Sequence, residues 1–214
     1  MVNLARMTRY ETQDDLHAGI IALSSIEQRF AGVHGQHGTP SLRRAKPSLE
    51  TLLIVVTEQF LSLKAAEAIW ARAKSRIGDV TPANVLSVST EEFLALGISR
   101  GKAKCFHGCA SANFDFDALS TLPIEELRKS LLSIWGVGPW TADIYLLSVV
   151  GHTDAWPAGD VALQAAAQNL FNMRKRPDAK KLEKIAAKWR PHRAAAARLL
   201  WAHYRGMKEM PQPE

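Results

Sequence analysis

Segments with helical periodicity follow one another along most of the chain, and no stretch alternates apolar and polar residues for long enough to form a sheet. Residue usage agrees with this pattern, because the 214 residues include 31 Ala and 24 Leu but only 11 Val and 11 Ile. Alanine and leucine are strong helix formers, whereas strands favour β-branched residues. The sequence therefore predicts an all-α protein of roughly ten helices joined by short connections.

Capping residues, glycines and prolines mark where these helices begin and end. We expect helices over residues 14–30, 49–59, 62–76, a short one from 82, then 90–96, 99–112, 123–132, 139–150, 161–171, 179–189 and 194–204. Residues 31–47, which contain several glycines and two histidines, are expected to form a surface loop, as are residues 152–159.

Several classes of protein are excluded early. The longest aliphatic run, Leu52–Val56, is too short to span a bilayer. Residues 1–11 carry two arginines with no apolar stretch behind them, so we expect no secretory signal. Two cysteines, Cys105 and Cys109, cannot build a disulfide framework, a four-cysteine metal site or an iron–sulfur cluster. A reducing, cytoplasmic location is expected.

The net charge of +6 is unevenly distributed. Residues 172–214 hold 12 Lys/Arg against 4 Asp/Glu, whereas residues 1–171 hold 15 against 17. A basic segment in an otherwise neutral chain favours a polyanionic partner, nucleic acid first, although a solvated helix face is equally consistent with the charge count.

Residues 123–150 predict two helices joined by Gly136-Val137-Gly138, with proline first in the second helix. The two glycines allow a tight turn that brings backbone N–H groups to the surface. Together with the N-terminus of the second helix, which includes Thr141, they would form an anion site suited to a DNA phosphate. Such a contact reads no base sequence. A plain helix–helix turn is the alternative.

The residues that follow the hairpin are more specific. Trp140-Thr141-Ala142 continues the second helix, and Trp156-Pro157-Ala158-Gly159-Asp160 places an acidic residue at the start of the next. The chain thus resembles the helix–hairpin–helix DNA glycosylase superfamily, and within it the bacterial 3-methyladenine DNA glycosylase II family most. Further stretches that carry the resemblance are 57–62, 64–66, 96–99, 102–103, 134–142, 157–163, 189–193 and Trp201.

The resemblance implies one catalytic core over residues 1–214, with a two-lobed all-helical fold and an active cleft between the lobes. Residues 1–44 and 136–214 would form one lobe and residues 45–135 the other, with the helix–hairpin–helix at 123–150.

By the same resemblance, Asp160 matches the catalytic aspartate of the family. Release of a base from deoxyribose passes through a sugar with oxocarbenium character, which a nearby carboxylate stabilises while it orients the attacking water. A plain helix N-cap is the other interpretation of Asp160.

Trp140 and Trp201 match tryptophans that line the base pocket in the family. An indole face attracts a cationic methylated purine by cation–π interaction, worth roughly 0.5–2 kcal/mol. Bifunctional relatives carry a lysine in place of Trp140, because an amine is needed for the Schiff base, so the chain is expected to be monofunctional.

Phe60, with Gln59 beside it, matches the wedge that fills the space left by a flipped base. The alternative for Phe60 is a buried position in the seam between two helices. The resemblance alone also implies a monovalent cation, Na⁺ or K⁺, at the carbonyls of Leu132, Ile134 and Val137.

The resemblance, together with these residues, implies a monofunctional DNA glycosylase of base excision repair that flips alkylated purines such as 3-methyladenine out of the duplex and hydrolyses their N-glycosidic bonds. No cofactor is required. The expected partner is double-stranded DNA with a damaged base, bound by a monomer associated with the nucleoid, without a membrane. Two alternatives stay open: a glycosylase for deaminated or oxidised bases such as hypoxanthine, and a non-catalytic DNA-binding module.

Overall fold

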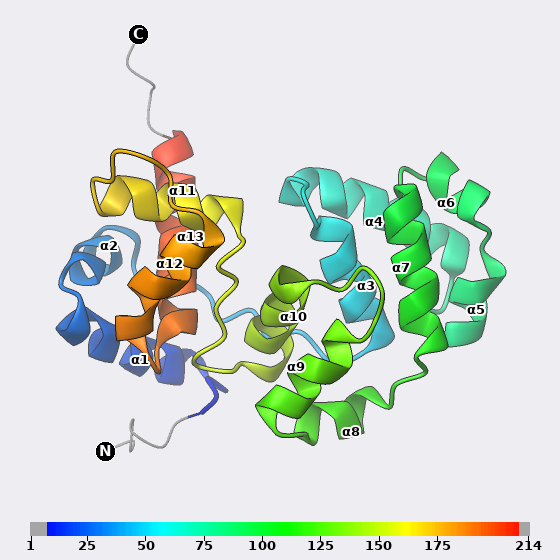
Figure 1. Ribbon diagram of the computed structural model, residues 1–214, viewed down its shortest axis with the longest axis horizontal. Helices are drawn as coiled ribbons and strands as arrows, with labels where there is room; N and C mark the ends of the chain where they lie inside the picture. Colours follow the sequence, from blue (N-terminus) through cyan, green and yellow to red (C-terminus); the bar gives the residue numbers. More distant parts are fainter. Residues whose placement is uncertain (1–7, 210–214) are drawn as a thin grey trace, which may run out of the picture. The chain divides into compact units, whose positions relative to one another are not determined.

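The computed structural model describes residues 8–209, and the regular elements in that range are helices (Figure 1). The all-α prediction is therefore confirmed. Within residues 8–209 no helix has the length and apolar character needed to cross a membrane. Residues 1–7, on which the expectation about a secretory signal partly rests, lie outside the described residues.

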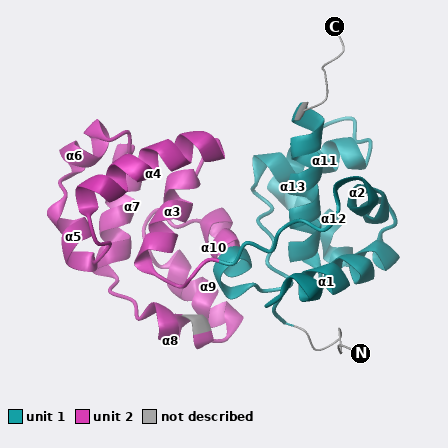
Figure 2. Ribbon diagram, turned by 180° about the vertical axis from the view of Figure 1, so that it is seen from behind, with its two compact units in different colours: residues 1–44, 146–214 teal, residues 45–145 magenta. Residues whose placement is uncertain are grey.

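The chain divides into two compact units, coloured separately in Figure 2. Unit 1 comprises Met1–Arg44 and Leu146–Glu214, and unit 2 comprises Ala45–Tyr145. The helices of unit 1 are α1 (Gln13–Ile26), α2 (Arg29–His37), the π-helix η2 (Leu146–Val150), α11 (Val161–Leu170), α12 (Ala179–Ala186), the 3₁₀ turn η3 (Ala187–Trp189) and α13 (Arg193–Glu209). The helices of unit 2 are α3 (Leu49–Glu58), α4 (Leu63–Ile77), α5 (Pro82–Ser87), α6 (Thr90–Ala95), α7 (Arg100–Ser111), α8 (Phe116–Thr121), α9 (Ile124–Leu132) and α10 (Pro139–Tyr145).

One boundary differs from the lobes expected from the sequence. The resemblance implies that residues 136–145 belong with residues 1–44, but the structure groups them with unit 2. The reason is that α10 packs against α3 and α9, so the turn at Gly136–Gly138 and both flanking helices, α9 and α10, belong to the same unit.

Unit 1 is built around α13, which packs against α1, α2 and α11. The run Ala194–Ala197 on α13 is fully buried, and its small side chains allow neighbouring helices to approach closely. Trp189 is fully buried in the same unit, stacked on Phe171 and edge-on to Phe30 and Trp156. This places Trp156 and Trp189 in the core of the unit.

Unit 2 is organised by α7, which packs against α3, α5 and α6. Its core includes Phe93 and Phe106, whose rings meet edge to face at 5.3 Å. Local capping sets the helix starts, since a hydroxyl side chain accepts a backbone N–H at the N-cap of five helices: Ser48, Ser62, Thr81, Ser89 and Ser99. The helix starts predicted at these positions are confirmed.

The prediction of a loop over residues 31–47 is wrong in its first part, because α2 extends to His37. Phe30 and Val33 are buried on one face of α2, and α2 packs against α13. That packing outweighs the low helix propensity of the glycines in α2. The helix expected over 14–30 is correspondingly two helices, since Glu27 is extended and ends α1.

Two further elements were not predicted. The short helix α8 (Phe116–Thr121) occupies a segment with little periodicity, and its start is capped by Asp115. The helix expected over 139–150 changes after Tyr145 into the π-helix η2, a form that is rare and often marks functional sites.

Candidate catalytic and DNA-binding site

Asp160 is the N-cap residue of α11. A tight turn leads to it, in which the N–H of Asp160 donates to the carbonyl of Pro157 at 2.9 Å. Its side-chain Oδ1 accepts a hydrogen bond from the N–H of Leu163 at 2.9 Å. Asp160 is therefore an N-cap, which is compatible with both interpretations, and capping also holds the carboxylate in one orientation, as a catalytic group requires.

Trp201 on α13 contacts the same carboxylate. Its indole Nε1 donates a hydrogen bond to Oδ1 of Asp160 at 3.2 Å, across the packed pair α11 and α13. The candidate catalytic residue and one candidate pocket residue, 41 positions apart, are therefore neighbours. Trp140 lies in unit 2, in the first turn of α10, and is partly buried.

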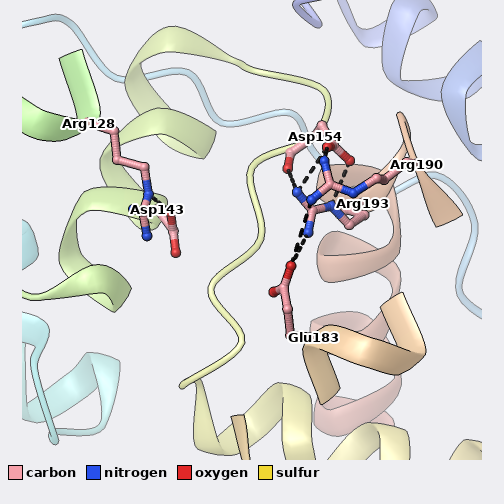
Figure 3. Close-up of polar contacts among 6 residues, drawn as sticks. All are labelled: Arg128, Asp143, Asp154, Glu183, Arg190 and Arg193. Carbon is pink, nitrogen blue, oxygen red and sulfur yellow. Dashed lines mark hydrogen bonds and ion pairs between the residues drawn. The ribbon is translucent and has the colours of Figure 1, made fainter. Parts of the chain in front are cut away.

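An ion network holds the loop that precedes Asp160 (Figure 3). Arg193, 8% exposed, donates to both carboxylate oxygens of Asp154, at 2.7 Å from Nε and 2.9 Å from Nη2. Arg190 adds a third bond to Asp154 at 2.6 Å, and Glu183 accepts from Arg193 at 2.6 Å. A bidentate, mostly buried arginine–carboxylate pair of this kind fixes geometry as well as charge.

The stretch 189–193 carries part of the family resemblance, and nothing in the sequence assigns it a role. The structure shows that its two arginines bind Asp154, six residues before Asp160, and that Ala194 donates its N–H to the carbonyl of Thr153. The positive charge of the two arginines is evident in the sequence. Residue spacing does not identify Asp154 as their partner, because Asp154 and Arg193 lie 39 residues apart.

The two glycines of the hairpin have different requirements. Gly136 has φ +86°, and a Cβ on it would lie 2.9 Å from the Cβ of Cys105. A Cβ on Gly138 would meet nothing within 4 Å, so packing within the chain does not require glycine there. Between them Val137 is buried, and its N–H donates to the carbonyl of Ile134 at 3.1 Å. The fold therefore leaves no space for a side chain at Gly136, whereas a side chain could be accommodated at Gly138.

Gln59 bridges the end of α3 to the hairpin. Its side-chain Nε2 donates to the carbonyl of Gly136 at 3.1 Å and to Oγ1 of Thr141 at 2.8 Å. Thr141 is buried, so its hydroxyl serves this internal contact. The structure therefore brings together four of the residues assigned from sequence to the wedge and the phosphate site, namely Gln59, Gly136, Val137 and Thr141.

Phe60 is fully exposed, at 100%, and its φ is +58°. The alternative in which Phe60 is buried between two helices is therefore wrong. A large apolar side chain gains nothing from exposure to water, and a positive φ costs a bulky residue of order 1 kcal/mol or more. Phe60 therefore departs from two tendencies at once, the burial of large apolar side chains and the avoidance of positive φ by bulky residues. Such departures are typical of positions retained for function.

Glu58, the last residue of α3, has a raised pKa. Burial raises its pKa to about 7, and the negative charge of nearby Glu67 adds to the rise. Between the ordinary pKa of a glutamate and about 7, the folded protein therefore binds more protons than the unfolded chain, so folding stability falls as pH rises through this window.

We expect Glu58→Gln to remove that pH dependence. At pH 8 the variant should be more stable than the parent by about 3 kcal/mol, and near pH 4 the two should converge, because both side chains are then neutral. Urea unfolding at a series of pH values measures this difference. Glu67→Gln is the matched control and should give a smaller gain, since it removes only the like-charge repulsion. Parallel pH profiles for the parent and Glu58→Gln would contradict the assignment.

The two cysteines lie on one face of α7, buried, with their sulfurs 4.0 Å apart. Within residues 8–209 no group of three His, Cys, Asp or Glu side chains is placed to hold a metal ion.

Comparison with known proteins agrees with this geometry. Residues 53–192 match the model of the HhH-GPD superfamily of base excision DNA repair proteins. The chain is 29% identical over 192 residues to the alkylbase DNA glycosidase-like protein mag2 of Schizosaccharomyces pombe, covering 84% of this chain and 89% of that one. It is 28% identical to DNA-3-methyladenine glycosylase 1 of the same yeast, with 85% and 84% covered.

A solved structure gives the same result at the level of the fold. The 3-methyladenine DNA glycosylase Mag1 of Schizosaccharomyces pombe, in complex with abasic DNA, superposes with a TM-score of 0.79 and 25% identity. The match covers 92% of this chain and 100% of that one. The family match extends over the hairpin and Asp160, and the chain belongs to the HhH-GPD superfamily of base excision DNA repair proteins.

Proposed function

We propose that this protein is a monofunctional DNA glycosylase that hydrolyses the N-glycosidic bond of alkylated purines in duplex DNA. The observation that carries the proposal is the Asp160 carboxylate, held at the N-cap of α11 by the N–H of Leu163 and the indole of Trp201. The relatives named for alkylated bases and for 3-methyladenine support the substrate class.

In this proposal Asp160 acts on the sugar. Its negative charge stabilises the oxocarbenium character that develops as the glycosidic bond breaks, and it orients the water that attacks the anomeric carbon. An N3- or N7-alkylated purine is already cationic and leaves readily, so one carboxylate is sufficient. Trp201, hydrogen-bonded to Asp160, and Trp140 are proposed to offer aromatic faces to that cationic base.

The test of the substrate class is excision from duplexes that each carry one defined lesion, followed by alkaline cleavage of the abasic product. We expect release of methylated purines to exceed that of hypoxanthine and of oxidised bases. If hypoxanthine were the preferred substrate, the class of lesion would be wrong, whereas binding without release of any base would favour a non-catalytic DNA-binding module.

The absence of an amine at the Trp140 position predicts simple hydrolysis. The abasic product should break no faster with the enzyme than by spontaneous cleavage, because no Schiff base can form there. Borohydride reduction during the reaction measures this directly. A trapped covalent protein–DNA adduct would contradict the prediction.

The hairpin, Gly136, Val137 and Gly138 with Thr141, is proposed to bind one DNA phosphate through its backbone N–H groups other than that of Val137, which donates to the carbonyl of Ile134. Gly138→Leu should weaken binding about tenfold for damaged and undamaged duplexes alike, because a side chain there blocks the approach of phosphate without disturbing the fold. Gly136→Ala should instead lower the melting temperature, because it collides with Cys105 at a positive φ.

Binding isotherms at several salt concentrations, together with melting curves, separate the two glycine variants, since phosphate contacts give affinity a steep salt dependence. If Gly138→Leu changed lesion preference while leaving overall affinity intact, the phosphate role of the hairpin would be wrong.

Three further features belong to the proposal. The Ile134 carbonyl, which accepts from Val137, keeps a second lone pair, so it and the carbonyls of Leu132 and Val137 suit a monovalent cation at the hairpin.

The exposed basic residues after Phe171, among them Arg174, Lys175 and Arg176, are proposed to contact further phosphates. The protein is proposed to act on nucleoid DNA as a monomer.

A further inference from the structure

The turn that presents Phe60 is strained and needs support. Gln59 has φ −51° and ψ 123°, Phe60 has φ +58°, and the N–H of Leu61 donates to the carbonyl of Glu58 at 3.1 Å. This is the geometry of a type II turn, in which the residue at the position of Phe60 is normally glycine. Because phenylalanine is costly there, contacts from elsewhere in the fold must hold the turn.

Lys102 on α7 provides such contacts. Its Nζ donates to the carbonyl of Gln59 at 2.7 Å and to the carbonyl of Thr57 at 2.8 Å. These two carbonyls belong to the C-terminal end of α3, where unpaired oxygens and the helix dipole favour a cation. The Lys102 side chain is partly buried, and burial lowers its pKa, so placing an ammonium group here carries a cost that the two carbonyls offset.

The same turn is held from its other side by the Gln59 side chain, which binds the hairpin at Gly136 and Thr141. The backbone carbonyl of Gln59 binds Lys102 while its side-chain amide binds the hairpin, so Gln59 is held at both ends. Phe60, the next residue, makes no such contact and projects into solvent. The turn is therefore held by hydrogen bonds on both sides, up to the side chain that it presents.

We infer that Lys102 is a positioning residue for base flipping, which keeps Phe60 in its insertion-ready conformation by holding the carbonyls of Thr57 and Gln59. The inference rests on the proposed glycosylase function and on Phe60 as the wedge. Holding the strained turn before DNA arrives removes the cost of ordering it during flipping, so the benefit appears in the rate of flipping and excision. Lys102 acts through Phe60 and does not itself bind phosphate.

The test compares Lys102→Met, Phe60→Ala and the double variant with the parent. Single-turnover excision from methylated duplex should fall about tenfold in Lys102→Met, equivalent to roughly 1.4 kcal/mol, the scale of a lost charge-assisted hydrogen bond. The double variant should be no slower than Phe60→Ala alone, because Lys102 has no role once the wedge is gone. Lys102→Arg, which keeps a donor cation, should recover part of the rate.

Two binding measurements distinguish positioning from the alternatives. Affinity for undamaged duplex and its salt dependence should be the same in Lys102→Met and in the parent. Arg100→Met is the matched control, because it removes one positive charge from the same helix, where Arg100 is 72% exposed and pairs with Glu91 at 3.9 Å. If Lys102→Met alone lowered affinity and reduced the salt dependence, Lys102 would be a phosphate contact and the inference would be overturned.

A flipping readout separates this inference from the proposed function. Fluorescence of 2-aminopurine opposite a tetrahydrofuran abasic analogue reports unstacking without any excision. The parent should raise the fluorescence, and Phe60→Ala and Lys102→Met should both reduce that rise. A parent that unstacks the reporter but excises no base would overturn the glycosylase function alone. Two results would overturn the positioning role alone. Lys102→Met could unstack the reporter and excise bases as fast as the parent, or the double variant could be slower than Phe60→Ala by the full factor that Lys102→Met loses on its own. Melting curves show whether Lys102→Met is slow because it is unfolded. In that case Lys102→Arg is compared with the parent in its place.

Discussion

Asp160→Asn should reduce single-turnover base excision by about 10³-fold while leaving affinity for duplex DNA within about a factor of two. The substitution keeps the shape of the side chain and its capping bond to Leu163, because asparagine is an equally good N-cap residue. It removes the negative charge that stabilises the developing oxocarbenium ion. Excision of methylated bases and DNA binding, measured on the same preparations, test both halves of this expectation.

Asp178→Asn is the control that isolates charge from capping. Asp178 caps α12 by accepting from the N–H of Lys181 at 2.7 Å, in the same unit, and it is exposed. Its substitution should leave excision unchanged. Near-parental excision by Asp160→Asn would mean that Asp160 is only a helix cap and that the catalytic assignment is wrong.

Asp154→Ala should produce the largest loss of stability, about 3 kcal/mol in the free energy of unfolding, because it leaves the mostly buried guanidinium of Arg193 without its bidentate partner (Figure 3). Excision should fall as well, because Asp154 anchors the loop that leads into Asp160. Urea unfolding monitored by tryptophan fluorescence is suitable, since Trp156 and Trp189 are buried in the same unit.

Glu183→Ala is the matched control for that loss. Glu183 accepts from the same guanidinium, but its side chain is 47% exposed, so its removal should cost less than about 1 kcal/mol. Equal losses in the two variants would show that the network contributes no more than an ordinary surface ion pair.

Several features could be predicted from the sequence because they depend on residues close together in the chain. The caps at Ser48, Ser62, Thr81, Ser89 and Ser99 each involve a bond to a residue three positions on, and the predicted helix starts are found there. The position of the hairpin and of Asp160 before a helix could be predicted for the same reason.

Where packing outweighed local propensity, the prediction was wrong. The glycines of residues 31–38 favour a loop, yet α2 forms there because Phe30 and Val33 become buried and α2 packs against α13, far away in the sequence. Phe60 shows the converse case, since an apolar residue between two helices is normally expected in the core and is here fully exposed.

The helical class, the main helix starts and the hairpin could be predicted from the amino-acid sequence, because each depends on residue types within a few positions of one another, whereas the candidate catalytic role of Asp160 follows from the family resemblance. The groups that orient these features are found only in the folded protein. Trp201 donates to Asp160 across 41 residues, Arg193 holds Asp154 across 39, and Lys102 reaches the carbonyl of Gln59 across 43. These contacts form because packed helices bring distant side chains together, and no local pattern specifies which donor will meet which acceptor.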